Sequence, residues 1–309
     1  MTDDTNALGR RELLKCMAWA GSGVLVTVGA GIPGSITLDQ ALAKPVSPAF
    51  SFVQISDSHI GFNKPPNLDA RSTFAEALAK IKALETKPQF IVHTGDVSQL
   101  SRDDEFDDAR EMLRETGIPT FFIPGEHDVL DPEQGAAFKQ RFGRGETGQG
   151  WYSFDHGGVH FVALVNVLNL QAGGMGNLGS EQLEWLRRDL KRFGSSTPVV
   201  VFAHIPLWTM YEPWGWGTDD SGEALKLLAR FGSVTILNGH VHQIAQKVEG
   251  HMKFHTALST AFPQPAPGTA PSPGPLKVDP GKLRGLLGIT SAAVSRNRGP
   301  LALIDSALV

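Results

Sequence analysis

Three ionisable side chains stand together where an apolar run of this sequence ends. The run at 121–123, Phe-Phe-Ile, stops at a Pro-Gly pair and is followed at once by Glu126, His127 and Asp128. Carboxylates and imidazoles donate and accept protons, and they are common oxygen and nitrogen ligands of metal ions. The segment therefore indicates acid–base or metal chemistry at the end of a buried strand.

Residues of the same kind follow other apolar runs. They are Asp57 and His59 after the run at 50–56, Asp96 after 89–93, His204 after 198–203, and His240 and His242 after 234–237. Ligands of an open α/β sheet collect outside the carboxyl ends of its strands, so we expect these side chains to converge. A single His at a strand end commonly caps or packs, but the repetition favours one shared site.

The chemistry that needs such a set is a pair of metal ions. Imidazole suits Zn, Fe, Ni and Cu, carboxylate suits Mn and Mg, and a mixed set suits Mn, Fe or Zn. The one-residue spacing of Asp57 and His59 lets two side chains from one turn reach the same centre or two neighbouring centres. Gly95, Gly125 and Gly239 permit tight turns and a close approach of the backbone.

Apolar periodicity predicts the elements that position these residues. We expect strands at 50–56, 89–93, 119–123, 198–203, 234–237, 243–249 and 252–257, a hairpin of 151–155 and 159–167, and a weak strand at 301–304. We expect helices at 68–84, 103–115, 180–193 with Ser180 as the N-cap, and 222–231. The acidic face around Glu105 is expected to be solvated. Strand–helix alternation followed by hairpins favours mixed sheets with helices outside.

These blocks, in this order, resemble the calcineurin-like metallophosphoesterases. The matching motifs are Asp57-x-His59, Gly95-Asp96, Gly125-x-His127-Asp128, His204 and Gly239-His240-x-His242, and the resemblance covers about residues 50–257. It implies an α/β fold, a four-layer sandwich of two mixed β-sheets flanked by helices. It also implies a metal-dependent phosphoric ester hydrolase with two bound metal ions, here Fe, Mn or Zn.

The resemblance also implies a role for each residue. Asp57, His59 and His242 would bind the first metal, Asp96 would bridge both, and Glu126, His204 and His240 would bind the second. His127 would protonate the leaving alkoxide or steady the phosphoryl group, and Asp128 would orient His127. Two cations held in this way would acidify a shared water, and the resulting hydroxide would attack phosphorus in line.

Glu126 departs from the family pattern, which has Asn at this position. An ionised Glu offers only acceptors and adds a negative charge, so attraction for an anionic substrate weakens. A trivalent iron would return the lost charge, which leads to the hypothesis of an Fe-containing centre. The alternative is that Glu126 points away or is protonated.

Two functions are compatible with these motifs. The first is a hydrolase of a small-molecule phosphate ester, either a phosphodiester such as a cyclic nucleotide or a phosphomonoester. The alternative is a non-catalytic, metal-dependent binding module on the same fold. The 28 basic and 32 acidic residues give a formal charge of −4, so no global positive field attracts nucleic acid, and no nucleic-acid partner is expected.

The N-terminus resembles a twin-arginine export signal. Arg10 and Arg11 precede a Gly-rich apolar run at 17–32, which is too short for a membrane span, and a small-x-small cleavage site lies at 41–43. We expect an export signal at 1–43, the metallophosphoesterase domain at 44–261, and a Pro-rich segment and C-terminal extension of the same domain at 262–309. The protein would meet the export machinery and be periplasmic or secreted.

Other features allow a functional and a structural interpretation. Trp208, Tyr211, Trp214 and Trp216 could form an aromatic wall for a base, sugar or lipid chain, or simply pack the loop. Asn166 and Asn169 could face the site or belong to a turn, and His93 is expected to be a core residue.

Overall fold

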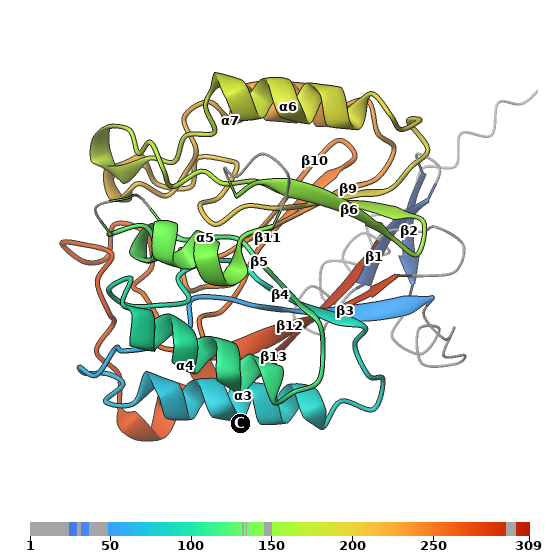
Figure 1. The fold of residues 1–309 in the computed structure, drawn as a ribbon. Helices are drawn as coiled ribbons and strands as arrows, with labels where there is room; N and C mark the ends of the chain where they lie inside the picture. Colours follow the sequence, from blue (N-terminus) through green and yellow to red (C-terminus); the bar gives the residue numbers. More distant parts are fainter. Residues whose placement is uncertain are drawn as a thin grey trace, which may run out of the picture.

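Two β-sheets pack face to face at the centre of the molecule, with helices over their outer faces (Figure 1). The computed structural model describes residues 49–309 apart from 132, 134, 145–149 and 295–300. It also describes the backbone of β1 (Leu25–Gly29) and β2 (Ile32–Ile36), an antiparallel pair. The rest of the expected export signal at 1–43 lies outside the described residues.

Each sheet combines parallel and antiparallel strands. The first has five strands in the order β13 (Ala302–Ala307), β12 (Gly288–Val294), β3 (Phe50–Ile55), β4 (Phe90–His93) and β5 (Thr120–Phe122). The second has six in the order β10 (Gln246–Glu249), β11 (Met252–Thr256), β9 (Val234–Asn238), β8 (Val199–Phe202), β7 (Val159–Ala163) and β6 (Tyr152–His156). β3, β4 and β5 run parallel, as do β7, β8, β9 and β11.

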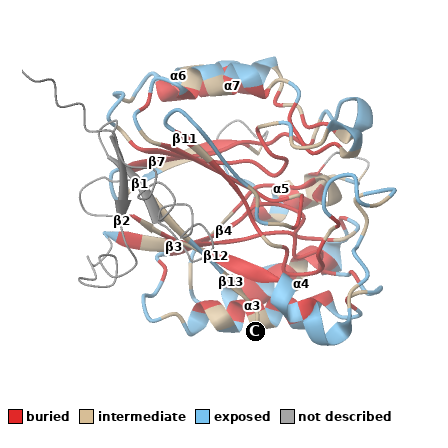
Figure 2. Ribbon diagram, turned by 180° about the vertical axis from the view of Figure 1, so that it is seen from behind, coloured by how far each residue is buried: buried red, intermediate tan, exposed pale blue. Residues whose placement is uncertain are grey.

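The helices divide between the two sheets. α3 (Ala70–Lys82), α4 (Asp103–Arg114) and α5 (Ala136–Phe142) lie with the five-stranded sheet, and α6 (Ser180–Leu190) and α7 (Ser221–Leu228) cover the six-stranded one. The outward faces of the helices are exposed, whereas the central strands are buried (Figure 2). This is the predicted sandwich of two mixed sheets flanked by helices.

Side-chain alternation along the strands produces the layers. In β3, Phe52 packs between the sheets and Val53 packs against the helices. In β8, Phe202 packs between the sheets and Val201 packs toward α6 and α7. Successive side chains of a strand point to opposite faces, so a strand apolar at every position is buried on both. Each fully buried aromatic or aliphatic side chain contributes about 1.5–3 kcal/mol.

The structure corrects several local predictions. Ser180 is not the N-cap of α6: Gly179 holds that position, and the Asp220 carboxylate accepts hydrogen bonds from the backbone N–H groups of Leu178 and Gly179. Glu105 is not solvated but 5% exposed. Its carboxylate turns back to accept from the backbone N–H groups of Leu100 and Arg102, which the start of α4 would otherwise leave unpaired.

Among the α-helices and strands within residues 49–309, α5 and β12 were not predicted. β12 places the second half of the C-terminal extension between β3 and the terminal strand β13. Its sequence, Gly-Ile-Thr-Ser-Ala-Ala-Val, carries small side chains and little periodicity, so pairing with β3 decides its conformation.

Candidate active site

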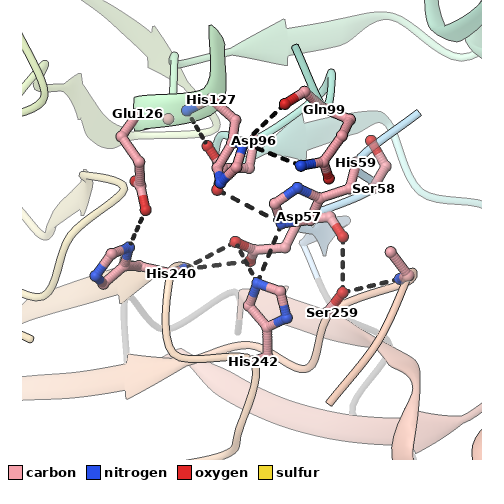
Figure 3. Close-up of polar contacts among 12 residues, drawn as sticks. Asp57, Ser58, His59, Asp96, Gln99, Glu126, His127, His240, His242 and Ser259 are labelled. Atoms are coloured by element: carbon pink, nitrogen blue, oxygen red, sulfur yellow. Dashed lines mark hydrogen bonds and ion pairs between the residues drawn. The ribbon is translucent and has the colours of Figure 1, made fainter. Parts of the chain in front are cut away.

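The predicted metal ligands come together at the carboxyl ends of parallel strands from both sheets. Figure 3 labels all of them except His204. Asp57 and His59 follow β3, Asp96 follows β4, and Glu126 opens η1 (Glu126–Asp128) after β5. His204 follows β8, and His240 and His242 follow β9. The site therefore lies where the two sheets meet, and neither sheet alone holds it.

The backbone at these positions is in an unusual conformation. Asp57, His59, Asp96, His240 and His242 all have positive φ, between 40° and 70°. This region costs a non-glycine residue about 1–3 kcal/mol and persists only where the surroundings hold it. Among the described residues, Ser101 is the only other non-glycine with positive φ. The strain is thus concentrated at the predicted ligands.

Three glycines allow the turns to approach each other. A Cβ at Gly125 would lie 2.1 Å from Asp96 Oδ1, and one at Gly239 would lie 2.1 Å from Ser56 Oγ. At Gly95, which has φ +97°, it would lie 2.4 Å from His204 Nδ1. A side chain at any of these positions would displace residues of the cluster.

One group of potential ligands contains Asp57, His59 and His242. His242 Nε2 lies 3.2 Å from Asp57 Oδ1 and 3.3 Å from His59 Nε2. The Asp57 carboxylate also accepts from the His240 backbone N–H, at 3.1 Å to Oδ1, which ties the turn after β9 to the turn after β3. All three side chains are buried.

The second group contains Glu126, His204 and His240. Glu126 Oε2 lies 2.8 Å from His204 Nε2, and Oε1 lies 2.8 Å from His240 Nδ1. Glu126 therefore points into the cluster and not away from it. Asp96 stands between the groups, because its Oδ2 is 3.5 Å from both His59 Nε2 and His204 Nε2.

The ring orientations and the donor atoms fit bound cations. His204 Nδ1 donates to the Thr94 carbonyl at 2.7 Å and His242 Nδ1 donates to the Phe262 carbonyl at 2.6 Å, so each ring is oriented with Nε2 toward the cluster. His204 Nε2, both ring nitrogens of His240 and Glu126 Oε2 are buried without a partner in hydrogen-bond geometry among the described residues. Nitrogen and oxygen atoms that converge closely but do not pair suit two metal ions.

Electrostatics keep the carboxylates of Asp57, Asp96 and Glu126 ionised. Burial raises the pKa of Glu126, but His240 and His204 outweigh burial and hold it well below its ordinary value. Burial likewise raises the pKa of Asp57, but His242 and His204 outweigh burial, and the pKa is lowered. Burial lowers the pKa of His59 to about 3, so its imidazole is neutral and can act as a ligand.

His127 and Asp128 do not interact as predicted. The His127 ring donates from Nδ1 to the Gln99 carbonyl at 2.8 Å. The Asp128 carboxylate instead accepts from the backbone N–H groups of Val97, Ser98 and Gly125, and so fixes the turn that carries His127. Burial opposes protonation of His127, but Asp96 and Glu126 outweigh it and raise its pKa. In its protonated form the ring can donate a proton.

A cavity of about 500 Å³ opens over the cluster. Its lining includes His59, Asp96, Glu126, His127 and His240, together with Phe62, Lys64, Gln99, Trp216, Phe262, Gln264 and Lys277. Sequence reasoning missed Gln99, Phe262, Gln264 and the two lysines, because they lie in loops without a metal-ligand pattern. The Pro-rich segment at 262–275 thus forms a wall of the site.

Of the remaining candidate residues, one lines the cavity and others are structural. Of the aromatic segment, Trp216 lines the cavity, whereas Trp208 packs on Phe254 within the core under α7. Asn166 is buried and donates to the Ile205 carbonyl, and Asn169 is exposed. His93 is a buried residue whose Nε2 contacts Ser58 Oγ at 2.9 Å.

Comparison with known proteins agrees with this geometry. The calcineurin-like phosphoesterase family profile matches residues 50–244. The chain belongs to the calcineurin-like phosphoesterase family. Members of this family depend on two metal ions, and the protein is accordingly a metal-dependent phosphoric ester hydrolase.

Individual relatives within the family differ in what they hydrolyse. A 3',5'-cyclic-nucleotide phosphodiesterase from Nostoc sp. is 25% identical over 69% of this chain and 79% of its own length. A serine/threonine-protein phosphatase from Danio rerio is 28% identical over 65% of this chain and 73% of its own. The solved dimetal phosphatase of Danio rerio has the same fold, with a TM-score of 0.63 at 14% identity over 85% of this chain and 98% of that chain.

Among the described residues, no helix is both long and apolar enough to cross a membrane.

Proposed function

We propose that this phosphoesterase is an exported dinuclear-metal enzyme that hydrolyses a phosphodiester. Asp57, His59 and His242 would hold one cation, Glu126, His204 and His240 the other, and Asp96 both. The support is the convergence of these atoms in two groups that share Asp96. When bound, the two cations would supply an activated water and neutralise charge on the phosphoryl oxygens.

The expected preference for a diester depends on Glu126, the third carboxylate of the site after Asp57 and Asp96. Two divalent cations and one hydroxide bear about +3 in formal charge, and ionised Asp57, Asp96 and Glu126 cancel it. Glu126 faces both His204 and His240, and its pKa is lowered well below its ordinary value. Whichever metals bind, Glu126 makes the centre one unit less positive than a neutral side chain would, and this favours the singly charged diester over the doubly charged monoester.

The protein's own residues would prepare the leaving group. His127 is held by the Gln99 carbonyl through Nδ1 and lines the cavity, so its other nitrogen is free to donate to substrate. Lys64 and Lys277 at the cavity rim would attract the anion. Burial under Phe62, Phe262 and Trp216 would exclude water from the reacting bond.

Hydrolysis of bis-p-nitrophenyl phosphate, compared with p-nitrophenyl phosphate, tests the assignment. The metal-loaded protein is expected to turn over the diester faster, and removing metal with a chelator is expected to abolish both activities. His127→Ala should keep its metal content and lose about 10²–10⁴-fold in turnover. If protein with two bound metal ions hydrolysed neither ester, the alternative of a non-catalytic binding module would be favoured.

We also propose that the centre contains iron. A trivalent iron beside a divalent partner would leave the centre at about +1, which still attracts the singly charged diester, and Glu126 would still make it one unit less positive than Asn would. Elemental analysis of protein purified without added metal is expected to find iron, and a content of zinc or manganese alone would refute this proposal.

Export through the twin-arginine pathway is the remaining part of the proposal. It is supported by the order of Arg10-Arg11, the apolar run and the cleavage site at 41–43. A reporter protein fused after residue 46 should be exported from the cytoplasm. The same fusion with both Arg10→Lys and Arg11→Lys should stay in the cytoplasm. Equal distribution of the two fusions would contradict export.

A further inference from the structure

A second cavity meets the first at the catalytic residues. It has a volume of about 370 Å³ and shares Glu126 and His127 with the larger cavity over the cluster. The rest of its lining is entirely aliphatic and consists of Val129, Leu130, Val167, Leu168 and Leu170. We call this the aliphatic cavity.

The aliphatic cavity rests on packed structure. Val167 is 2% exposed and belongs to a buried cluster with Trp151, Val165 and Ile205. Val129 and Leu168 pack on the same cluster, and the Leu130 backbone N–H donates to Ser101 Oγ at 2.9 Å. The base of the cavity is therefore fixed, whichever molecule enters it.

Its outer wall is left open to water. Leu130 is 56% exposed and Leu170 is 44% exposed, directly beside an ionised carboxylate and a histidine. An apolar ligand that covers these leucines would remove apolar surface from water, and this burial favours binding.

The first cavity has the opposite character. Gln99 Oε1, Gln264 Oε1 and Trp216 Nε1 are buried and have no hydrogen-bond partner among the described residues, and all three side chains line this cavity. Lys64 and Lys277 stand at its rim. Unpaired buried polar atoms favour a ligand that carries hydroxyl or amide groups.

We propose that the substrate is an unsymmetrical linear phosphodiester with one aliphatic arm and one hydrogen-bonding arm. The phosphate would sit at the shared residues, the aliphatic arm in the aliphatic cavity, and the other arm among Gln99, Gln264 and Trp216. A cyclic nucleotide carries both ester oxygens on one sugar, so it fills only one cavity. The inference rests on the proposed phosphodiesterase function and names its substrate class.

The reaction balances as a simple hydrolysis. One water is consumed, a P–O bond forms to its oxygen, and the P–O bond to one arm breaks. The departing oxygen takes a proton from His127, and the products are an alcohol and a phosphomonoester.

Competition with bis-p-nitrophenyl phosphate tests the proposal on the metal-loaded full chain. Hexyl methyl phosphate and dimethyl phosphate, whose alkoxides leave slowly, serve as inhibitors. This readout does not depend on which arm departs. Hexyl methyl phosphate is expected to have an inhibition constant at least about tenfold lower, because each methylene in an apolar pocket adds affinity. Equal inhibition constants for the two phosphates would overturn this proposal. Turnover of bis-p-nitrophenyl phosphate in the same assay would still support the phosphodiesterase function.

Variants of the exposed wall localise the effect. Leu170→Asp and, separately, Leu130→Asp should reduce the preference for the hexyl arm to about threefold or less, since each places a carboxylate in the aliphatic cavity. Leu286→Asp is the matched control, because Leu286 is 37% exposed and lines neither cavity. It should keep the full preference. Thermal melting confirms that each variant is folded.

Two outcomes would contradict the proposal. A hexyl preference that survives in both wall variants would mean that the chain binds elsewhere. A 3',5'-cyclic nucleotide that competes better than hexyl methyl phosphate, and equally well in Leu170→Asp, would assign the site to cyclic diesters.

Discussion

Glu126 lies 2.8 Å from both His204 and His240, at the position where the resemblance to the family leads us to expect a neutral Asn. At the scale of single residues, this carboxylate and the cluster glycines decide what the site can do. The Glu126 carboxylate sets the charge of the site, and the glycines let the turns come close enough for the ligand cluster to form.

Glu126→Asn is expected to shift the enzyme toward monoesters. Removing one negative charge within a few ångströms of the phosphate strengthens attraction for a dianion more than for a monoanion, since interaction energy scales with charge. The ratio of kcat/KM for p-nitrophenyl phosphate to that for bis-p-nitrophenyl phosphate should rise about tenfold. An unchanged ratio would show that the charge of Glu126 does not reach the substrate.

Gly125→Ala is expected to destroy the metal centre. The added Cβ would meet Asp96 Oδ1 at 2.1 Å and push the shared carboxylate away. Metal content should fall by at least one ion per chain, with loss of activity. Gly222→Ala is the control: Gly222 lies in α7 with open space at its Cβ position, and alanine there should stabilise by up to about 1 kcal/mol.

At the scale of elements, a buried histidine joins α6 to the six-stranded sheet. His160 of β7 contacts Asp155 Oδ1 at 2.8 Å through Nδ1 and Asp189 Oδ2 at 2.7 Å through Nε2. Ser153 of β6 donates to the other oxygen of Asp189 at 3.0 Å. The contacts hold the helix in register over the sheet edge.

This junction predicts a pH dependence of stability. Burial raises the pKa of Asp189, but His160, Ser153 and Arg192 together outweigh burial and lower it. A lowered folded-state pKa means that the stabilisation is present above the unfolded-state value of about 3.9 and is lost as the pH falls through the folded value. Asp189→Asn should be less stable at pH 7 and lose less stability between pH 5 and 3. Parallel wild-type and variant denaturant curves across that range would disprove the linkage.

At the scale of the whole molecule, the C-terminal extension completes a sheet. β12 pairs with β3 on one side and β13 on the other, and Ala292 is buried between the two sheets. Without β12, β3 would present an unpaired edge beside the residues that lead into Asp57.

Ala292→Asp should therefore destabilise the entire domain. An unpaired carboxylate between the sheets is expected to cost about 3 kcal/mol or more. Its neighbour Ala293 points to the other face and is half-buried, so Ala293→Asp should cost about 1 kcal/mol or less. Denaturant unfolding measures both. Equal effects would mean that residues 288–309 do not fold with the sheet.

Several features followed from the sequence alone. The strand–helix order, the type of fold and the ligand positions after each strand are local properties: an apolar run marks the strand, and Asp, Glu or His after it marks the site. Asp57, His59, Asp96, Glu126, His204, His240 and His242 could be named because each stands directly beyond such a run.

Other features were decided only by the tertiary structure. The small residues of β12 become a strand by pairing with β3, and Glu105 is buried because nearby backbone N–H groups need an acceptor. The second cavity exists because loops after β5 and β7, far apart in sequence, lie side by side. Contacts between distant segments leave no periodic mark in either segment, so no local pattern could have predicted them.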